Sequence, residues 1–289
     1  MKDLIRELRI ACGLSQEEFA EEIRSSFATV NRWENLHNAP SESAQKMILK
    51  TCHRYGVNVS DIVVNRLKSE AASIRDASDC LILYHGSKFG IEGDIMPKSR
   101  TFCDFGSGFY MGTDPLQSLT LVCDYPDSKF YMLSFEQGGL NTLELTVDLD
   151  WAMYVAYHRG KLDEIRGSKL YQRFAAMERD KDIIIGNIAD DRMFYVLDNF
   201  FQGQITDAAL VDSLSALQLG KQYVAVTQKG CEHIKIEREV ELSYLEKESL
   251  KETSEKMRND GVVFANTICA KHRRDGRFFD EILESEAAR

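Results

Sequence analysis

Five short amphipathic helices crowd the first 67 residues, and this is the strongest constraint that the sequence places on the fold. Apolar residues recur at helical spacing over residues 2–12, 15–23, 27–36, 41–55 and 59–67. Ser15 and Glu18 form a capping box that starts the second helix, and Ser25 or Ser26 caps the third. A tight connection between the second and third of five short helices predicts a helix-turn-helix domain.

The residue pattern of this segment is similar to that of a known family. The string LRIACGLSQEEFAEEI…SSFATVNRWENLHNAPS resembles the Xre/Cro-repressor family from about Lys2 to Ile62. The resemblance implies that the third helix reads a DNA operator. The residues it implies at the DNA are a phosphate neighbour, Gln16, and a recognition face made of Ser26, Phe27, Thr29 and Arg32. The alternative is a helical bundle used for protein contacts, because Phe27 stands where a polar base reader is common.

Charge divides the chain into two parts. The whole chain has a net charge of −10, but residues 1–70 contain ten Lys or Arg and ten Asp or Glu and are neutral. The rest is acidic and would repel nucleic acid at long range. If the protein binds DNA, its first segment must do so.

The remaining sequence mixes short strands and helices without a regular βαβ alternation, which predicts an α+β fold. The segments with strand character are 81–87, 108–113, 129–135, 141–147, 182–188, 221–227 and a stretch from residue 233. The segments with helical character are 116–122, 150–159, 162–179, 191–201 and 206–217. We expect a helix-turn-helix domain (1–67), a linker (68–79), a mixed-sheet domain (80–243) and a helical C-terminal extension (244–289).

The stretch DFGSGFYMGTD, from Asp104 to Asp114, could be a cofactor-binding loop or a glycine-rich turn. A protein kinase would need a catalytic H-R-D loop before its D-F-G, and none precedes Asp104. No G-x-x-x-x-G-K-[ST] string exists, which excludes a Walker loop. Gly108 leads into a strand, whereas the Rossmann fingerprint needs a third glycine opening a helix.

A His-Gly-Ser ending one strand, a G-x-G-F-Y about twenty residues later and a Gln-Tyr-Val strand near the end resemble the ADP-ribosyltransferase superfamily. The branch is the one with a His-Tyr-Glu triad, and the string YHGS…DFGSGFY…GNIADDRMF…QYV is similar to a bacterial family of unknown function within it. The resemblance implies a triad of His85, Tyr110 and Gln222, with Gln in place of the usual Glu. It also implies that Tyr110 stacks on the nicotinamide ring of NAD⁺, and it places Leu121 where a second stacking tyrosine is usual. The other cofactor-binding positions are expected at Gly86, Ser87, Arg100, Gly108, Ser118 and Asp191.

A glutamine in the third triad position can accept a hydrogen bond from a ribose hydroxyl but brings no negative charge. Asp104, Asp190 or Asp191 could supply that charge, and Arg100 or Arg192 could bind the pyrophosphate. Each of these features also has a structural explanation without a ligand. His85 could be a structural histidine, the G-x-G-F-Y stretch a bulged hairpin, and the pair Asp190-Asp191 a helix cap. No metal ion is expected.

These patterns predict transfer of one ADP-ribose from NAD⁺ to a protein or nucleic-acid acceptor, coupled to DNA binding. The resemblance also implies a toxin-like role with an antitoxin-like protein partner. A transcriptional regulator with a degenerate NAD⁺-sensing domain and an NAD⁺ glycohydrolase are the alternatives. Seven scattered cysteines and no apolar run of about 20 residues predict a cytoplasmic protein with no membrane segment.

Overall fold

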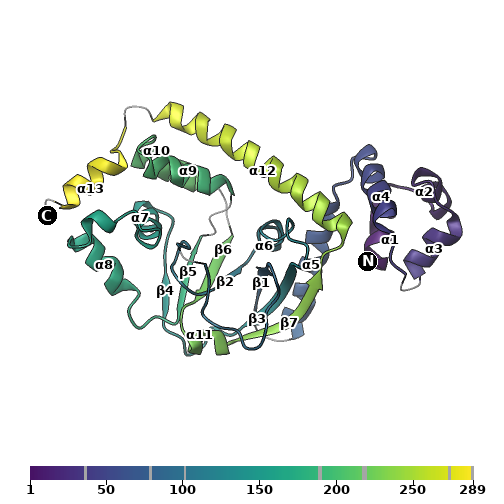
Figure 1. Cartoon of the computed structure of the whole chain (residues 1–289), viewed down its shortest axis with the longest axis horizontal. Helices are drawn as coiled ribbons and strands as arrows, with labels where there is room; N and C mark the ends of the chain where they lie inside the picture. Colours follow the sequence, from purple (N-terminus) through teal and green to yellow (C-terminus); the bar gives the residue numbers. More distant parts are fainter. Residues whose placement is uncertain are drawn as a thin grey trace.

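The computed structural model describes residues 1–35, 38–77, 80–100, 102–187, 191–216, 220–272 and 275–287, without the side chains of residues 2, 77, 191, 192, 216, 265, 269 and 287 (Figure 1). A small helical unit is followed by a mixed seven-stranded sheet with helices packed on it, which confirms the predicted α+β class. No helix within these described ranges is long and apolar enough to cross a membrane.

The helical unit contains the five predicted helices: α1 (Lys2–Ala11), α2 (Gln16–Glu22), α3 (Phe27–Asn35), α4 (Glu42–Arg54) and α5 (Val59–Ala77). The capping box of α2 is present, with the backbone nitrogen of Glu18 donating to Ser15 Oγ over 3.1 Å. Ser26 is the residue that caps α3, because its Oγ accepts from the backbone nitrogen of Thr29 over 3.2 Å. Helix α5 continues through most of the stretch expected to be a linker, since that stretch contains neither glycine nor proline.

The sheet has the strand order β4-β5-β6-β2-β1-β3-β7. Its strands are β1 (Leu81–Ser87), β2 (Phe109–Gly112), β3 (Lys129–Phe135), β4 (Thr142–Glu144), β5 (Ile183–Asn187), β6 (Lys221–Ala225) and β7 (Ile234–Glu241). Strands β4 and β5 pair in parallel, and the other five pairs of neighbouring strands are antiparallel. All seven strands occur within the segments that were predicted to have strand character.

The helices after the sheet begins are α6 (Pro115–Thr120), α7 (Leu149–His158), α8 (Lys169–Met177), α9 (Asp191–Phe201), α10 (Asp207–Ala216), α11 (Gln228–Glu232), α12 (Tyr244–Lys271) and α13 (Phe279–Ala287). One prediction was wrong in detail. Residues 162–179 form a short 3₁₀ turn, Asp163–Ile165, and then α8. The break occurs because Ser168 uses its hydroxyl to cap α8, accepting from the nitrogen of Tyr171 over 3.2 Å.

Alternate strand residues face two sides of the sheet. On one side, Tyr84 belongs to a core that it shares with α6, and Val224 and Ile184 belong to a core shared with α7 and α9. On the other side, Leu83 and Met111 belong to a third, smaller core. Helices α6, α7 and α9 therefore cover the first side, and α11 contributes Cys231 to the core on the second.

Helix α12 joins the helical unit to the sheet domain. In Figure 1 it runs along the top of the molecule from the helical unit on the right toward α13 on the left. Its start packs on α4 and α5, where Leu245 and Leu250 complete the apolar core of the helical unit. A buried hydrogen bond of 2.8 Å joins the hydroxyls of Ser60 and Ser249 across this contact. The helical unit and the sheet domain thus share one continuous core.

Candidate functional site

Three neighbouring strands carry the positions that the sequence assigned to a triad. His85 lies on β1, Tyr110 on β2 and Gln222 on β6, and these strands are adjacent in the sheet. The pairing of Tyr84 with Gly112, and of Gly112 with Gln222, aligns them. Residues far apart in sequence are therefore brought to one region of the sheet.

The register also decides which side chains share a face. Paired residues point to the same side and successive residues alternate, so Gln222 and Tyr110 lie on the side of Tyr84 and Gly112. His85 follows Tyr84 directly and points to the opposite side. Within the described residues β1 and β2 share this single register pair, so the backbone beyond it is not closed by strand pairing and a ligand there could reach groups on both faces.

The imidazole of His85 connects β1 to the backbone of β2. Its Nδ1 lies 2.7 Å from the carbonyl oxygen of Tyr110. A carbonyl oxygen only accepts, so Nδ1 carries the hydrogen and donates it. Burial lowers the pKa of His85, which keeps the ring neutral and leaves Nε2 as an acceptor. The side chain can therefore bind a hydroxyl group through Nε2.

This neutral, buried ring predicts a pH dependence of stability. The pKa of His85 is lower in the folded chain than its ordinary value of 6.5. Its contribution is therefore complete above pH 6.5 and is lost as the pH falls through the folded pKa. His85→Asn keeps a donor near Tyr110 but does not titrate. In urea unfolding between pH 7 and 5, the wild type should lose stability more steeply than the variant, by up to about 1.4 kcal/mol per pH unit. Parallel profiles would contradict the burial of a neutral ring.

Gln222 presents one free acceptor. The residue is 7% exposed, and its Nε2 donates to the carbonyl oxygen of Asn187 over 3.2 Å. With the nitrogen directed at a carbonyl, Oε1 is the atom that remains to accept a bond from a ligand. A glutamate at this position would instead set a carboxylate oxygen against the Asn187 oxygen.

The hydroxyl of Tyr110 ties the glycine-rich stretch to β2. It donates to the carbonyl oxygen of Gly106 over 2.7 Å and accepts from the backbone nitrogen of Phe105 over 3.0 Å. Burial raises the pKa of Tyr110, so the hydroxyl stays protonated. Phe105 is buried and its ring fills the space above Gly186, where an added Cβ would approach it to 2.4 Å. The hydroxyl of Tyr110 and the buried ring of Phe105 therefore both fix the glycine-rich stretch to the sheet.

Packing accounts for three glycines of the predicted site. A Cβ on Gly86 would lie 2.5 Å from the carbonyl oxygen of Ser118 on α6, and one on Gly108 would lie 2.5 Å from Val224. Gly106 has φ +76°, a conformation that favours glycine. The absence of side chains at Gly86 and Gly108 thus lets α6 and β6 approach, whereas the sequence reasoning assigned it to the approach of a cofactor.

Asp104 does not offer a free charge to Gln222. Arg159 donates to Asp104 Oδ1 from Nε over 3.0 Å and from Nη2 over 2.6 Å. Burial raises the pKa of Asp104 although this guanidinium opposes the shift. Arg159 also lies 4.5 Å from the ring of Phe194 and 3.6 Å from Asp198, both on α9. It therefore links the glycine-rich stretch to α9, and the idea that Asp104 replaces the missing glutamate is not supported.

The remaining predicted positions differ in their surroundings. Ser87 donates to the carbonyl oxygen of Gly90 over 2.8 Å, and buried Ser118 donates to that of Tyr84 over 3.2 Å. Arg100 is exposed. The positions that lie outside the described residues or side chains are Asp190, Asp191 and Arg192. Leu121 is 50% exposed and offers an aliphatic surface at the position where the resemblance implied a second stacking tyrosine.

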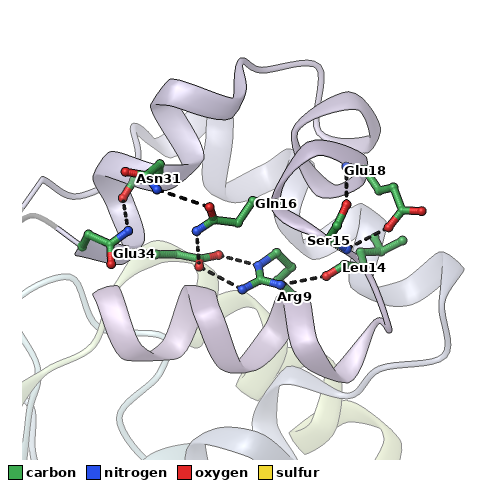
Figure 2. Close-up of polar contacts among 8 residues, drawn as sticks. Arg9, Leu14, Ser15, Gln16, Glu18, Asn31 and Glu34 are labelled. Atoms are coloured by element: carbon green, nitrogen blue, oxygen red, sulfur yellow. Dashed lines mark hydrogen bonds and ion pairs between the residues drawn. The ribbon is translucent and has the colours of Figure 1, made fainter.

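The helix-turn-helix unit has a polar network beneath its recognition helix (Figure 2). Glu34 is buried on α3 and forms an ion pair of 2.7 Å with Arg9 of α1. Gln16 donates to Glu34 over 2.7 Å and accepts from Asn31 over 3.3 Å, so its amide is fixed within the domain. One hydrogen of the Gln16 amide nitrogen remains for the phosphate contact that was expected.

Sequence reasoning missed the residues that hold these parts in place. Arg159 has no motif around it, and Phe105 lies inside the glycine-rich stretch but was given no role there. Only the folded chain shows that both residues secure this stretch. Glu34 had a signal, because a charged residue stands on the otherwise apolar face of α3 and Arg9 occupies a similar place on α1. Among the described side chains, no three His, Cys, Asp or Glu residues could together hold a metal ion.

Residues 81–236 match the family described as a protein of unknown function (DUF3990). The chain belongs to this family. Residues 5–53 match a helix-turn-helix family, so a DNA-binding type of domain precedes the DUF3990 domain. Neither the curated proteins nor the solved structures include a significant match to the chain. The matched DUF3990 region contains β1, β2 and β6, the strands that carry the candidate site.

Proposed function

We propose that this protein transfers a single ADP-ribose from NAD⁺ to a macromolecule, and that its helix-turn-helix domain brings the reaction to DNA. The observation that carries the proposal is the meeting of His85, Tyr110 and Gln222 on three adjacent strands. Two of these residues present an acceptor atom, Nε2 of His85 and Oε1 of Gln222. NAD⁺ has two riboses whose hydroxyl groups are the matching donors.

The reaction balances without a metal or a redox partner. The bond between the ribose C1′ and the nicotinamide nitrogen breaks, and the electron pair leaves with nicotinamide as a neutral amide. A nucleophilic atom of the acceptor bonds to C1′ and loses its proton. Gln222 would orient the ribose hydroxyl beside the developing positive charge, and hydrogen bonds placed in this way stabilise transition states. The aromatic ring of Tyr110 would pack on the nicotinamide.

A second candidate is a sensor that binds NAD⁺ without turnover. It is favoured by the charge at the site, because Gln222 is neutral and Asp104 is paired with Arg159. A site whose described residues offer no free carboxylate binds a dinucleotide more readily than it stabilises an oxocarbenium-like transition state. Loss of one contact that stabilises a transition state raises the activation barrier by on the order of 3–4 kcal/mol.

Incubation of the full chain with NAD⁺ labelled in its adenylate part, with and without cell lysate, distinguishes these functions. Label on protein or nucleic acid together with free nicotinamide supports transfer. Nicotinamide without labelled acceptor indicates a glycohydrolase, and NAD⁺ binding without nicotinamide indicates the sensor. No binding of NAD⁺ in calorimetry would overturn the proposal.

Variants of Tyr110 provide a control that separates its ring from its hydroxyl. Tyr110→Phe keeps the ring and removes the bonds to Phe105 and Gly106, so NAD⁺ affinity should change little if stacking is the contact. Tyr110→Ala should weaken affinity by about 0.5–1.5 kcal/mol more than Tyr110→Phe. Equal affinities of the two folded variants would remove the ring from the site.

A further inference from the structure

The start of the recognition helix presents an apolar surface. Phe27, the first residue of α3, is 45% exposed, and Ala28 beside it is exposed as well. Phe27 packs into none of the hydrophobic cores formed by the described residues. Close to half of this apolar side chain is therefore open to solvent, outside the cores of the domain.

The polar side chains on the same face are already engaged with one another. Ser26 Oγ caps the helix and lies 2.8 Å from Thr29 Oγ1. Arg32 donates from Nη2 to the same Thr29 oxygen over 3.3 Å. The hydroxyls of this face are thus partly satisfied within the helix, and Phe27 is the largest side chain of the face that lies outside every core of the described residues.

The chemistry of the major groove offers one apolar group to such a side chain. In the groove, adenine, guanine and cytosine show only hydrogen-bonding edges, whereas thymine also shows its C5-methyl group. The N-terminal residues of a recognition helix are the ones that contact base edges. We propose that the first turn of α3 selects its DNA site through a thymine methyl group packed against Phe27.

The electrostatics of the domain give this contact more weight. Residues 1–70 carry equal numbers of acidic and basic side chains, and α2 exposes Glu17, Glu18 and Glu21. Attraction to phosphates, which is the sequence-independent part of DNA binding, is therefore weak. A domain with little phosphate attraction depends on its base contacts. The exposed residues of α3 are Phe27, Ala28, Arg32 and Asn35, and Phe27 and Arg32 are the largest of them.

The test begins with the full-length chain and a library of random-sequence DNA duplexes. After selection of the enriched site, each thymine is replaced in turn by deoxyuridine, which keeps the hydrogen-bonding edge and lacks the methyl group. At one or two positions the replacement should weaken binding of the wild type roughly four-fold, the effect of one buried methyl-sized group. Phe27→Ala should bind more weakly overall and should respond to the same replacement by less than about two-fold.

Phe89→Ala is the matched control, because Phe89 is an exposed phenylalanine of the sheet domain, at 77% exposure. This variant should keep the full response to deoxyuridine. Circular dichroism checks that Phe27→Ala is folded, as its exposure leads us to expect. Equal deoxyuridine effects in the wild type and Phe27→Ala, or an enriched site without thymine, would overturn the proposal. So would a selection that enriches no duplex, which would assign Phe27 to a protein contact.

Discussion

Replacing Arg159 by methionine should lower the free energy of unfolding by about 3–5 kcal/mol at pH 7. The change leaves Asp104, which is 8% exposed, as a buried carboxylate without its cation. It also removes the guanidinium that lies against Phe194. Urea unfolding followed by circular dichroism measures the effect.

A matched control is available on the surface. Arg173 forms an ion pair of 2.7 Å with Asp150, with side chains 46% and 62% exposed. Arg173→Met should change stability by less than about 1 kcal/mol, because water screens exposed pairs. Equal losses in Arg159→Met and Arg173→Met would show that the Asp104 pair is solvated.

The loss in the free energy of unfolding caused by Arg159→Met should become smaller as the pH is lowered. Burial raises the pKa of Asp104 and, in the variant, no guanidinium opposes that rise. A carboxyl group whose pKa is raised by folding is tolerated below its ordinary pKa near 3.9 and destabilises the chain increasingly as the pH rises from there. The difference between wild type and variant should therefore shrink as the pH is lowered toward 4. A constant difference would assign the loss to packing alone.

Substitution of Gln222 should have the largest effect on chemistry. Under the proposed transfer reaction, Gln222→Ala removes the acceptor for the ribose hydroxyl and should cut nicotinamide release by on the order of 10–1,000-fold. Substantial and equal release by wild type and Gln222→Ala would mean that the triad has been placed on the wrong strand. Binding of NAD⁺ by both proteins without release would favour the sensor.

Gln222→Glu introduces the acid of the His-Tyr-Glu triad that the sequence resembles, but it should not raise nicotinamide release at neutral pH. The glutamine donates to the Asn187 oxygen, and an ionised glutamate cannot do so. Repulsion and burial should raise the pKa of the new carboxyl group and lower stability at pH 7 by about 1–3 kcal/mol. Stability should return as the pH falls through that raised pKa, because the protonated acid can donate. A variant as stable as wild type at pH 7 would show that the side chain has turned away from Asn187.

The shared core of the two domains affects any separate use of them. Leu245 and Leu250 of α12 close the core of the helix-turn-helix unit, and Ser60 bonds to Ser249 across the contact. The domain boundary expected at residue 67 lies within α5, so it does not correspond to a break in packing. Experiments on DNA binding and on NAD⁺ therefore use the full chain.

Short-range signals in the sequence were sufficient for the secondary structure and for the choice of strands. Ser15 and Glu18 marked the start of α2, and short segments of strand character contained all seven strands, because capping and local strand preference depend on near neighbours alone. The resemblance to known families selected His85, Tyr110 and Gln222 before their strands were known to be adjacent. The match to the helix-turn-helix family confirmed the first domain.

Long-range packing decided what these residues are able to do. The sequence cannot show that His85 and Gln222 point to opposite faces, because one residue of strand register reverses every side chain. It also could not show that Asp104 is neutralised by Arg159, or that Gln222 Nε2 meets the Asn187 oxygen, since these partners come from other elements. The charge and the free acceptor atoms of the site are properties of contacts between distant segments, and those contacts exist only in the folded chain.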